Sequence, residues 1–462
     1  MEPAQHSDRE TYRAIVFGKS GSELLLKSAG DRFLLPSVEI PRWERVAENL
    51  NVAFRNEWRQ EAVCLFELNI SDRFTPSDHD KYQVMECCRL ATPRSGAAWI
   101  PVSSLSERTF VNATDQLAVH RSLTQLSPGP LAPFARLGWF SELQEWIKEV
   151  IGPMGFHLTG RFSQLNASPS FSLVRFETSG PAVWFKGVGK PNLREFPITL
   201  ALAKLVPQHI PRILAVRPEW NGWLASEVKG TNLGEMRDTH HWKSAASSLA
   251  KLQFEFVGKC ETLLNSNAHD LRAPILLKLV RPFLNAMGQL MERQTKTPPA
   301  ILPKCDLTLL GEQIEEALLL CSDLGIPDTL GHLDLNPGNV FLCEDHCIFL
   351  DWAEAYVGNP FFSFQYLVEH FRHMASIDRA SQSSLTNSYL QEWRSFVLPE
   401  SLQDAWALIP MLAAFTYGAA TDAWCDQARL EEPKVAGYLR SLTRRIHREG
   451  RQLRDRGTRG SS

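Results

Sequence analysis

The sequence has no long uninterrupted hydrophobic run, so it offers no clear membrane-spanning helix. The longest apolar stretch, residues 406–420, is interrupted by Pro410 and is shorter than the ~20 residues needed to cross a bilayer. We expect a helix of the protein core there. The first residues, MEPAQHSDRE, lack a basic segment followed by an apolar one, so we expect no secretory signal.

Neither sign of charge is in excess, and the cysteine count is odd. The chain has 49 Lys and Arg against 52 Asp and Glu, a formal net charge of -3, which gives no overall field to attract nucleic acid or an anionic membrane. Nine cysteines argue against a disulfide framework and favour a cytoplasmic location. Cys343 and Cys347 have a spacing that zinc sites use, but no second ligand pair lies near, and we predict a hairpin turn instead.

Apolar and aromatic residues are plentiful enough for a large core. Hydrophobic residues make up 44% of the chain, with 13 Trp and 25 Phe, which excludes a largely disordered protein. Divided by the ~150 residues of an ordinary domain, 462 residues predict roughly three folding units.

Short apolar runs and turn residues predict two β-rich regions followed by a helical one. The expected elements, in chain order, are a β-meander at 12–36, a helix at about 41–68, strands within 82–101, a Pro/Gly-rich linker at 126–138, strands at 171–177 and 183–188, a helix at 193–205, and strands at 213–216 and 222–228. From residue 231 the chain is predicted to be mostly helical, apart from an interruption at 330–357.

That interruption, LGHLDLNPGNVFLCEDHCIFLDWAEA, contains the residues best suited to chemistry. Asp334 and Asn339 lie on a Pro/Gly-containing loop, and two apolar strands then lead to Asp351. A hairpin in this order brings Asn339 beside Asp351, and their oxygen atoms suit Mg²⁺, which completes its coordination with phosphate oxygens and water. Asp334, upstream on the same loop, is then available to accept a proton from an attacking hydroxyl.

The same residues resemble the catalytic segment of the kinase-like phosphotransferases. His332-Leu-Asp334-Leu-Asn-Pro-Gly-Asn339 matches the pattern H-x-D-x-x-x-x-N, and Asp351 followed by Trp352 looks like the metal-binding Asp of the aminoglycoside phosphotransferase and choline kinase branch. No Ala-Pro-Glu segment follows Asp351. The resemblance therefore implies a small-molecule acceptor rather than a protein.

The resemblance also implies roles for residues upstream. Lys186 in AVWFKGV would bind the donor phosphates, paired with Glu195 on the next helix. The backbone around Ser226, Glu227 and Val228, in WLASEVKG, would meet the adenine edge of the nucleotide.

Three further positions follow from the same comparison. The turn covering the phosphates is expected in SQLNASPS, residues 163–170, which lacks the G-x-G-x-x-G of protein kinases. His332 is expected to support the loop rather than to react. The Asp that usually braces this loop in the family is replaced by Ser363, which implies a weaker brace.

The first 125 residues resemble a degenerate Nudix domain, in which a loop and helix present glutamates to a metal bound to a diphosphate. Glu48, Glu57 and Glu61 have the spacing of the signature G-x5-E-x7-R-E-U-x-E-E-x-G-U. Four other signature positions depart from it, at Arg42, Asn56, Gln60 and Val63. Fewer carboxylates mean a weaker metal site, and an ordinary amphipathic helix is the alternative.

The sequence thus predicts an α+β protein: a bilobal kinase-like fold, with a small β-rich N-lobe and a large helical C-lobe, after an α/β Nudix-like domain. The predicted segments are 1–128 Nudix-like, 129–154 linker and lead-in helix, 155–229 N-lobe, 230–447 C-lobe with the catalytic loop, and 448–462 a flexible basic tail.

The predicted activity is Mg²⁺-dependent transfer of the terminal phosphate of ATP or GTP to an alcohol group of a small molecule, with Asp334 and His332 as catalytic residues and Asn339 and Asp351 as metal ligands. We expect neither nucleic acid nor membrane as a partner. Two alternatives stay open: a non-catalytic nucleotide-binding module, and a diphosphate hydrolase activity of the N-terminal domain.

Overall fold

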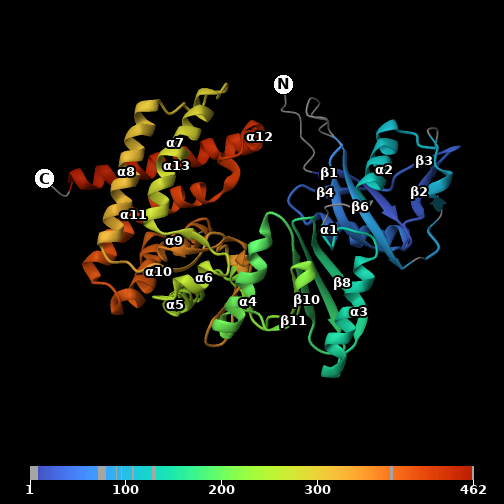
Figure 1. Ribbon diagram of the computed structural model, residues 1–462, viewed down its shortest axis with the longest axis horizontal. Coiled ribbons are helices and arrows are strands. Elements are labelled where there is room, and N and C mark those ends of the chain that lie inside the picture. Colours follow the sequence, from blue (N-terminus) through green and yellow to red (C-terminus); the bar gives the residue numbers. More distant parts are fainter. Residues whose placement is uncertain are drawn as a thin grey trace. The chain divides into compact units, whose positions relative to one another are not determined.

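The computed structural model divides the chain into two compact units. Unit 1 comprises Met1–Phe196 and Arg212–Glu227, and unit 2 comprises Pro197–Pro211 and Val228–Ser462. Unit 1 is rich in sheet and unit 2 is mostly helical (Figure 1), which confirms the predicted mixture of α and β. The residues described are 9–70, 80–89, 91–94, 96–106, 109–126, 132–374 and 378–459.

The first sheet of unit 1 has the strand order β3-β2-β1-β6-β5, with β4 paired to β1 and β7 paired to β2. β1 is antiparallel to β2 and β4 and parallel to β6. The meander predicted over 12–36 is confirmed. The strands are β1 (Arg9–Phe17), β2 (Glu23–Ala29), β3 (Arg32–Leu34), β4 (Ser37–Pro41), β5 (Glu61–Leu68), β6 (Asp80–Arg89) and β7 (Ala97–Pro101).

The long helix predicted over 41–68 is confirmed over residues 46–58 and wrong after Arg59. The range contains the end of β4, a short helix α1 (Val46–Ala53), a single π-helical turn at Phe54–Trp58, and then β5. The helical segment ends at Arg59, whose φ of 57° is left-handed, and the strand that follows is buried on both faces from Ala62 to Phe66. Burial of both faces removes the alternation that marks a strand in sequence, and the charged residues around it suggested a helix.

The second sheet of unit 1 shares a hydrophobic core with the first. Its strands lie in the order β11-β12-β10-β9-β8 and are β8 (Leu158–Ala167), β9 (Phe171–Thr178), β10 (Val183–Val188), β11 (Ile213–Arg217) and β12 (Gly222–Ser226). Helix α3 (Trp139–Ile151), the predicted lead-in helix, lies along this sheet (Figure 1), with the Phe140 ring 4.6 Å from that of Phe162. The same core includes Val63 and Leu65 of β5 and residues of α2 (Ala113–Leu126).

One buried side chain joins the two sheets directly. Gln164 of β8 is fully buried; its Oε1 accepts from the Cys64 N–H at 2.7 Å and its Nε2 donates to the Cys64 carbonyl at 2.9 Å. The amide therefore bonds to β5 as a neighbouring peptide would. Within unit 1 the N-terminal sheet is thus continuous, in packing and hydrogen bonding, with the segment predicted as the N-lobe.

Unit 2 contains helices around two small sheets, with orders β13-β16-β17 and β14-β18-β15. The predicted core helix at 406–420 is confirmed as the second part of α11, which includes Pro410. No helix in the described ranges has the length and apolarity of a membrane span.

The helices of unit 2 are α4 (Glu195–Leu205), which begins in unit 1, α5 (Thr239–Phe254), α6 (Cys260–Leu264), α7 (Ala273–Glu292), α8 (Lys304–Asp323), α9 (Phe361–Arg372), α10 (Arg379–Glu392), α11 (Pro399–Ala420), α12 (Gln427–Glu431) and α13 (Pro433–Arg459). The strands are β13 (Thr231–Asn232), β14 (His269–Leu271), β15 (Thr329–His332), β16 (Val340–Leu342), β17 (Cys347–Phe349) and β18 (Ala355–Gly358).

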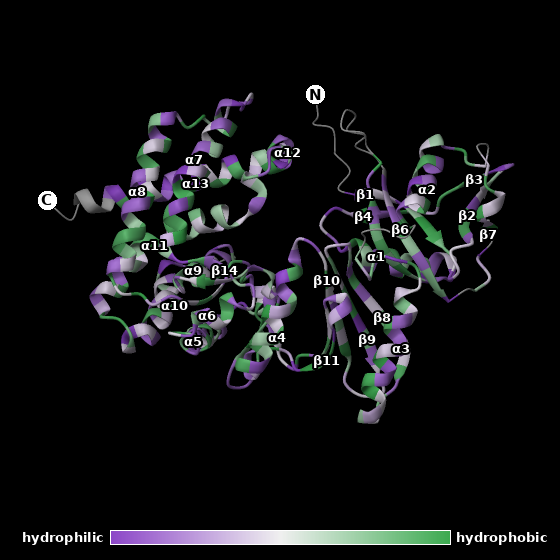
Figure 2. Ribbon diagram, viewed as in Figure 1, coloured by the Kyte–Doolittle hydropathy of each residue, from purple (hydrophilic) through white to green (hydrophobic). Residues whose placement is uncertain are grey.

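The flexible tail predicted over 448–462 differs from the structure, because α13 continues through most of it to Arg459. Apolar residues on α13 recur at helical spacing and pack on the core of unit 2: Leu439, Leu442, Ile446 and Leu453. Figure 2 shows hydrophilic and hydrophobic residues alternating along this helix. Arg448, Arg451 and Arg454, which suggested a solvated tail, therefore belong to the polar face of an amphipathic helix.

Unit 1 buries one carboxyl group. Glu86 on β6 is 2% exposed, and its Oε1 accepts a hydrogen bond from the Gly138 N–H at 2.9 Å, at the start of α3. Its Oε2 has no hydrogen-bond partner among the described residues. Burial raises the pKa of Glu86 to about 7, because the charged form loses its hydration.

We expect Glu86→Gln to stabilise the protein at pH 8 by on the order of 2 kcal/mol. A raised folded-state pKa means that the wild-type residue favours folding only while it is protonated, and this contribution is lost as the pH rises through 7. The amide keeps an acceptor for Gly138 and carries no charge, so the gain should disappear at pH 4, below the ordinary pKa of 4.5. Chemical denaturation at both pH values measures it, with exposed Glu67→Gln as the control. An equal effect at both pH values would contradict it.

Candidate active site

The segment from His332 to Asp351 forms a loop and a hairpin within unit 2. β16 and β17 are antiparallel, with Val340 opposite Phe349, as the predicted hairpin requires. The Leu350 N–H donates to the Asn339 carbonyl at 2.9 Å, so Asn339 and Asp351 lie at the same end of this hairpin. The turn between the strands contains Cys343, and Cys347 is the first residue of β17. The described residues include no group of three or more His, Cys, Asp or Glu suited to a metal.

Asp334 is half-buried at the centre of this loop. Its Oδ1 accepts from Asn336 Nδ2 at 3.3 Å and from the Tyr366 hydroxyl, on α9, at 3.3 Å. Burial raises the pKa of Tyr366, and the neighbouring Asp334 carboxylate raises it further, so Tyr366 stays protonated and acts as the donor. The carboxylate of Asp334 is therefore held by neutral donors, an arrangement that suits a general base.

His332 is 1% exposed and is bonded through both ring nitrogens. Nδ1 accepts from the Asp334 N–H at 3.1 Å, which places the ring proton on Nε2, and Nε2 donates to the Leu350 carbonyl at 3.0 Å. Its ring also packs against Trp352, with centroids 4.8 Å apart. These contacts tie the start of the loop to the strand that leads to Asp351, which is how a loop-supporting residue acts.

Asn339 and Asp351, the predicted magnesium ligands, both have distinctive local conformations. The Asn339 Nδ2 donates to the Asp334 carbonyl at 3.1 Å, which fixes the amide and leaves its Oδ1 as the atom for a cation. Asp351 has a φ of 63°, a left-handed conformation that costs on the order of 1 kcal/mol and that is common at binding sites. An amide oxygen and a carboxylate are donors that Mg²⁺ accepts.

Ser363, at the start of α9, is hydrogen-bonded to the catalytic segment at the position where the resemblance implies a brace. Its Oγ accepts the His332 backbone N–H at 2.7 Å and lies 3.1 Å from the Tyr356 hydroxyl, and the group is fully buried. A Cβ on Gly331 would lie 1.9 Å from the Tyr356 ring, so glycine is required there. The brace is present, although it is a neutral hydroxyl instead of a carboxylate.

A buried polar network supports the same strand from the other side. Gln253 of α5 donates to the carbonyls of Leu330 and Pro360 at 3.3 and 3.0 Å. Its Oε1 accepts from the Tyr389 hydroxyl, and its carbonyl accepts from Thr329 Oγ1, each at 2.5 Å. The network satisfies buried polar groups and holds β15 against α5, α9 and α10.

In unit 1, Lys186 and Glu195 form the predicted pair. Lys186 is on β10, opposite Leu173 of β9 and Trp223 of β12, and its Nζ is 2.5 Å from Glu195 Oε1. The two side chains are 12% and 2% exposed. A buried carboxylate of this kind needs its cation, because an unpaired buried charge is costly.

The predicted adenine and phosphate segments are partly occupied by hydrogen bonds within unit 1. The Ser226 N–H donates to the Arg212 carbonyl and the Glu227 N–H to the Ala182 carbonyl, at 2.9 and 3.0 Å. Glu227 Oε1 accepts from Arg175 Nε at 2.7 Å. The N–H groups of Ser226 and Glu227 are thus used within unit 1, and the predicted role of this segment at the adenine edge stays a prediction.

The turn expected to cover the phosphates lies between β8 and β9, but its donors are used internally. The N–H groups of Ser170 and Phe171 both donate to Ser168 Oγ at 3.2 Å, and the Ser168 N–H donates to the Phe171 carbonyl. Ser168 and Ser170 of the predicted segment thus use their N–H groups within the turn, and its role in covering the phosphates stays a prediction.

The Nudix-like glutamates do not share one helix. Glu48 is on α1, Glu57 is on the π-helical turn, and Glu61 begins β5. The Nudix-like reading of residues 1–128 therefore stays a prediction, and these three residues lack the helix that the signature requires.

Two site residues were missed from the sequence, Tyr366 and His370. Both are on α9, one helical turn apart, with ring centroids 5.0 Å apart, and Tyr366 contacts Asp334. Polar aromatic residues at i and i+4 in the helix after the catalytic segment were the available signal.

Comparison with known proteins gives similarity to solved structures only. No protein-family model matches the chain, and no curated protein matches it. A macrolide 2′-phosphotransferase from Brachybacterium faecium is 17% identical with a TM-score of 0.44, over 64% of this chain and 98% of its own. An ethanolamine kinase from Plasmodium vivax is 14% identical with a TM-score of 0.46, over 66% and 88%. A choline kinase from Cryptosporidium parvum is 14% identical with a TM-score of 0.46, over 68% and 97%.

We expect Ser363→Ala to lower the free energy of unfolding by about 1–3 kcal/mol, because the buried His332 N–H loses its acceptor. Ser244→Ala, which removes an exposed hydroxyl bonded to the His240 carbonyl, is the control and should have little effect. Urea denaturation of both variants measures the difference. Equal stability of the two variants would mean that Ser363 does not brace the loop.

Proposed function

We propose that this protein is a phosphotransferase that moves the terminal phosphate of ATP or GTP to an alcohol group of a small molecule. The observation that carries the proposal is the set of contacts around Asp334. Its carboxylate is oriented by Asn336 and Tyr366, and its backbone is bonded to both His332 and Asn339. Such positioning is what phosphoryl transfer chiefly requires of a protein.

In this mechanism the acceptor hydroxyl attacks the terminal phosphorus as the bond to the nucleoside diphosphate breaks, and Asp334 takes the hydroxyl proton. Lys186, held by Glu195, would bind the phosphates that are not transferred. The Glu227 carbonyl and the Val228 N–H would bind the base. His332 keeps the loop in place through its two ring bonds and does not exchange a proton.

Magnesium would be held by Asn339 and Asp351, and when bound it would neutralise charge that develops on the phosphates. The fixed amide of Asn339 and the left-handed backbone of Asp351 support this assignment. A cytoplasmic location, and the absence of nucleic acid and membrane partners, remain proposals from the sequence.

A second candidate is a nucleotide-binding module without catalytic activity. It is favoured by the β8–β9 turn, whose backbone donors are used within the turn. The hydrolase alternative has less support, since Glu61 is on a strand.

We expect Asp334→Asn to reduce phosphate transfer by about 10²–10⁴-fold, because the amide cannot accept the proton. Nucleotide affinity should change little. Asp345→Asn, in the exposed turn between β16 and β17, is the matched control and should retain full activity. Transfer over a panel of hydroxyl acceptors, with nucleotide binding measured separately, tests this, and wild-type activity of Asp334→Asn would remove Asp334 from its role.

Thermal shift with ATP and Mg²⁺ separates the two leading candidates. A ligand that binds the folded state raises the melting temperature in proportion to its affinity. Both candidates predict a shift, and only the phosphotransferase also predicts turnover. Absence of any shift contradicts both, whereas hydrolysis of nucleoside diphosphates by the whole chain favours the hydrolase.

A further inference from the structure

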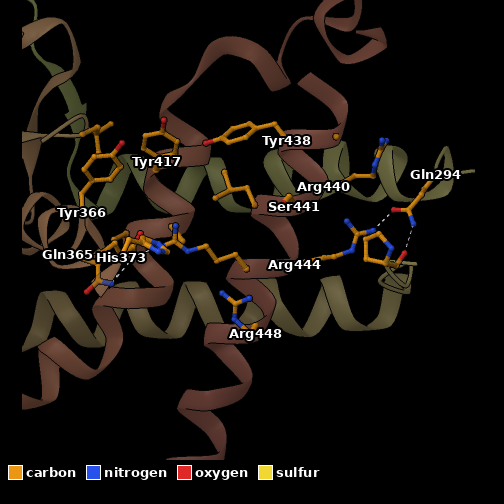
Figure 3. Close-up of a pocket in the computed structure, with 18 of the residues that line it drawn as sticks. Gln294, Gln365, Tyr366, His373, Tyr417, Tyr438, Arg440, Ser441, Arg444 and Arg448 are labelled. Carbon is orange, nitrogen blue, oxygen red and sulfur yellow. Dashed lines mark hydrogen bonds and ion pairs between the residues drawn. The ribbon is translucent and has the colours of Figure 1, made fainter. Parts of the chain in front are cut away.

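Unit 2 contains a cavity of about 1080 Å³ beside the catalytic loop. Its walls come from α9, α11 and α13 and from the segment after α7, residues 293–299. Figure 3 shows Tyr366, Tyr417 and Tyr438 along one part of the wall and Arg440, Arg444 and Arg448 following α13. The volume is sufficient for a metabolite-sized ligand.

The cavity reaches the proposed catalytic base. Leu333, the neighbour of Asp334, lines it, and so does Tyr366, whose hydroxyl donates to Asp334 Oδ1. A hydroxyl compound bound in the cavity would therefore lie next to the carboxylate that takes its proton. This makes the cavity the acceptor site of the proposed reaction.

The cavity wall is strongly basic. Glu369 is the one acidic side chain among the described residues that line it, and it forms an ion pair with Arg445 and accepts from Gln365. Six lysine and arginine side chains also line it: Arg293, Lys296, Arg440, Arg444, Arg445 and Arg448. Arg448 also forms an ion pair, with Glu449 at 3.3 Å. The other positive charge of the wall comes from Arg293, Lys296, Arg440 and Arg444.

The arrangement of the arginines supports the same conclusion. Arg444 donates to the Gln294 amide and to the Ala300 carbonyl, and Arg440 donates to the Leu290 carbonyl, so neutral acceptors hold both of them. Burial lowers the pKa of Arg444, and the neighbouring Arg440 lowers it further. An anion in the cavity would relieve this repulsion and form charge-assisted hydrogen bonds.

Another part of the wall consists of aromatic side chains. The rings of Tyr366 and Tyr417 are stacked, with centroids 6.0 Å apart and planes at 20°. Tyr438 extends this wall, and its hydroxyl points toward Tyr417 (Figure 3). Aromatic faces of this kind pack against the flat faces of sugar or aromatic rings.

We propose that the acceptor is a hydroxyl compound that carries an anionic group, a phosphate or a carboxylate, bound by the arginines of α13 while its ring packs on the tyrosines. The inference rests on the proposed function, of which it names the substrate class. Basic amino sugars and quaternary amines are disfavoured, since the wall would repel them.

Four hexoses with one scaffold and different charges test the proposal: glucose 6-phosphate, glucuronate, glucose and glucosamine. We expect calorimetric binding to the whole, nucleotide-free protein to weaken in that order. Added salt should weaken binding of the two anions and leave that of glucose unchanged, because salt screens charge. These measurements use the wild-type protein, so misfolding of a variant cannot affect them. Comparison of glucose 6-phosphate with glucuronate identifies the preferred anion.

Arg440→Gln and Arg448→Gln should each weaken glucose 6-phosphate binding by about tenfold, because each removes a charged donor. Arg394→Gln, at an exposed arginine of the turn Trp393–Ser395 outside the cavity, is the matched control and should bind as the wild type does.

The inference is overturned if glucose or glucosamine binds as tightly as glucose 6-phosphate, or if neither glucose 6-phosphate nor inorganic pyrophosphate binds at low salt. Transfer assays with ATP separate it from the proposed function. Anion binding without transfer to any hydroxyl supports the basic site and contradicts the phosphotransferase. Transfer to a cationic acceptor without anion binding supports the phosphotransferase and contradicts the anionic substrate.

Discussion

The hydrogen bond from the His332 N–H to the Ser363 hydroxyl is the interaction on which the candidate site depends. It joins the end of β15 to the first turn of α9, and both Asp334 and Tyr366 take their positions from those two elements. The bond is buried, so losing it would leave a donor without water or protein to accept it. Gln253, Thr329 and Tyr389 hold the same strand from the other side, so that the loop is fixed by neutral hydrogen bonds and not by charge.

Local sequence patterns were enough to predict much of the fold and the centre of the site. The order of Asp334, Asn339 and Asp351 around two apolar runs predicted the hairpin, and the structure has it. Alternation of residues predicted β9 and β10, and the resemblance to kinase-like phosphotransferases predicted the pairing of Lys186 with Glu195. These features depend on neighbours within about twenty residues, whose spacing the chain displays directly.

Features that depend on distant partners were not predictable in this way. Residues 61–68 are a strand because both faces are covered by remote parts of unit 1, and the arginine-rich end of the chain is helical because its apolar stripe packs on unit 2. Ser363 was expected to brace poorly, yet its partner is a backbone N–H, for which a hydroxyl suffices. The basic cavity is assembled from five segments between residues 293 and 448, and no local pattern marks it.

The two hydrogen bonds between Gln164 and Cys64 limit how far the chain can be shortened from its N-terminal side. The side-chain amide of Gln164 bonds to the backbone of Cys64 as a neighbouring strand would. The hydrophobic core of unit 1 contains residues from both of its sheets. Removal of the residues before β8 would expose that core to water. It would also leave the buried side-chain amide of Gln164 without its hydrogen-bond partners. The N-terminal sheet is therefore an inseparable part of the scaffold that carries Lys186, and shortened forms that begin near the kinase-like motifs would be prone to aggregation.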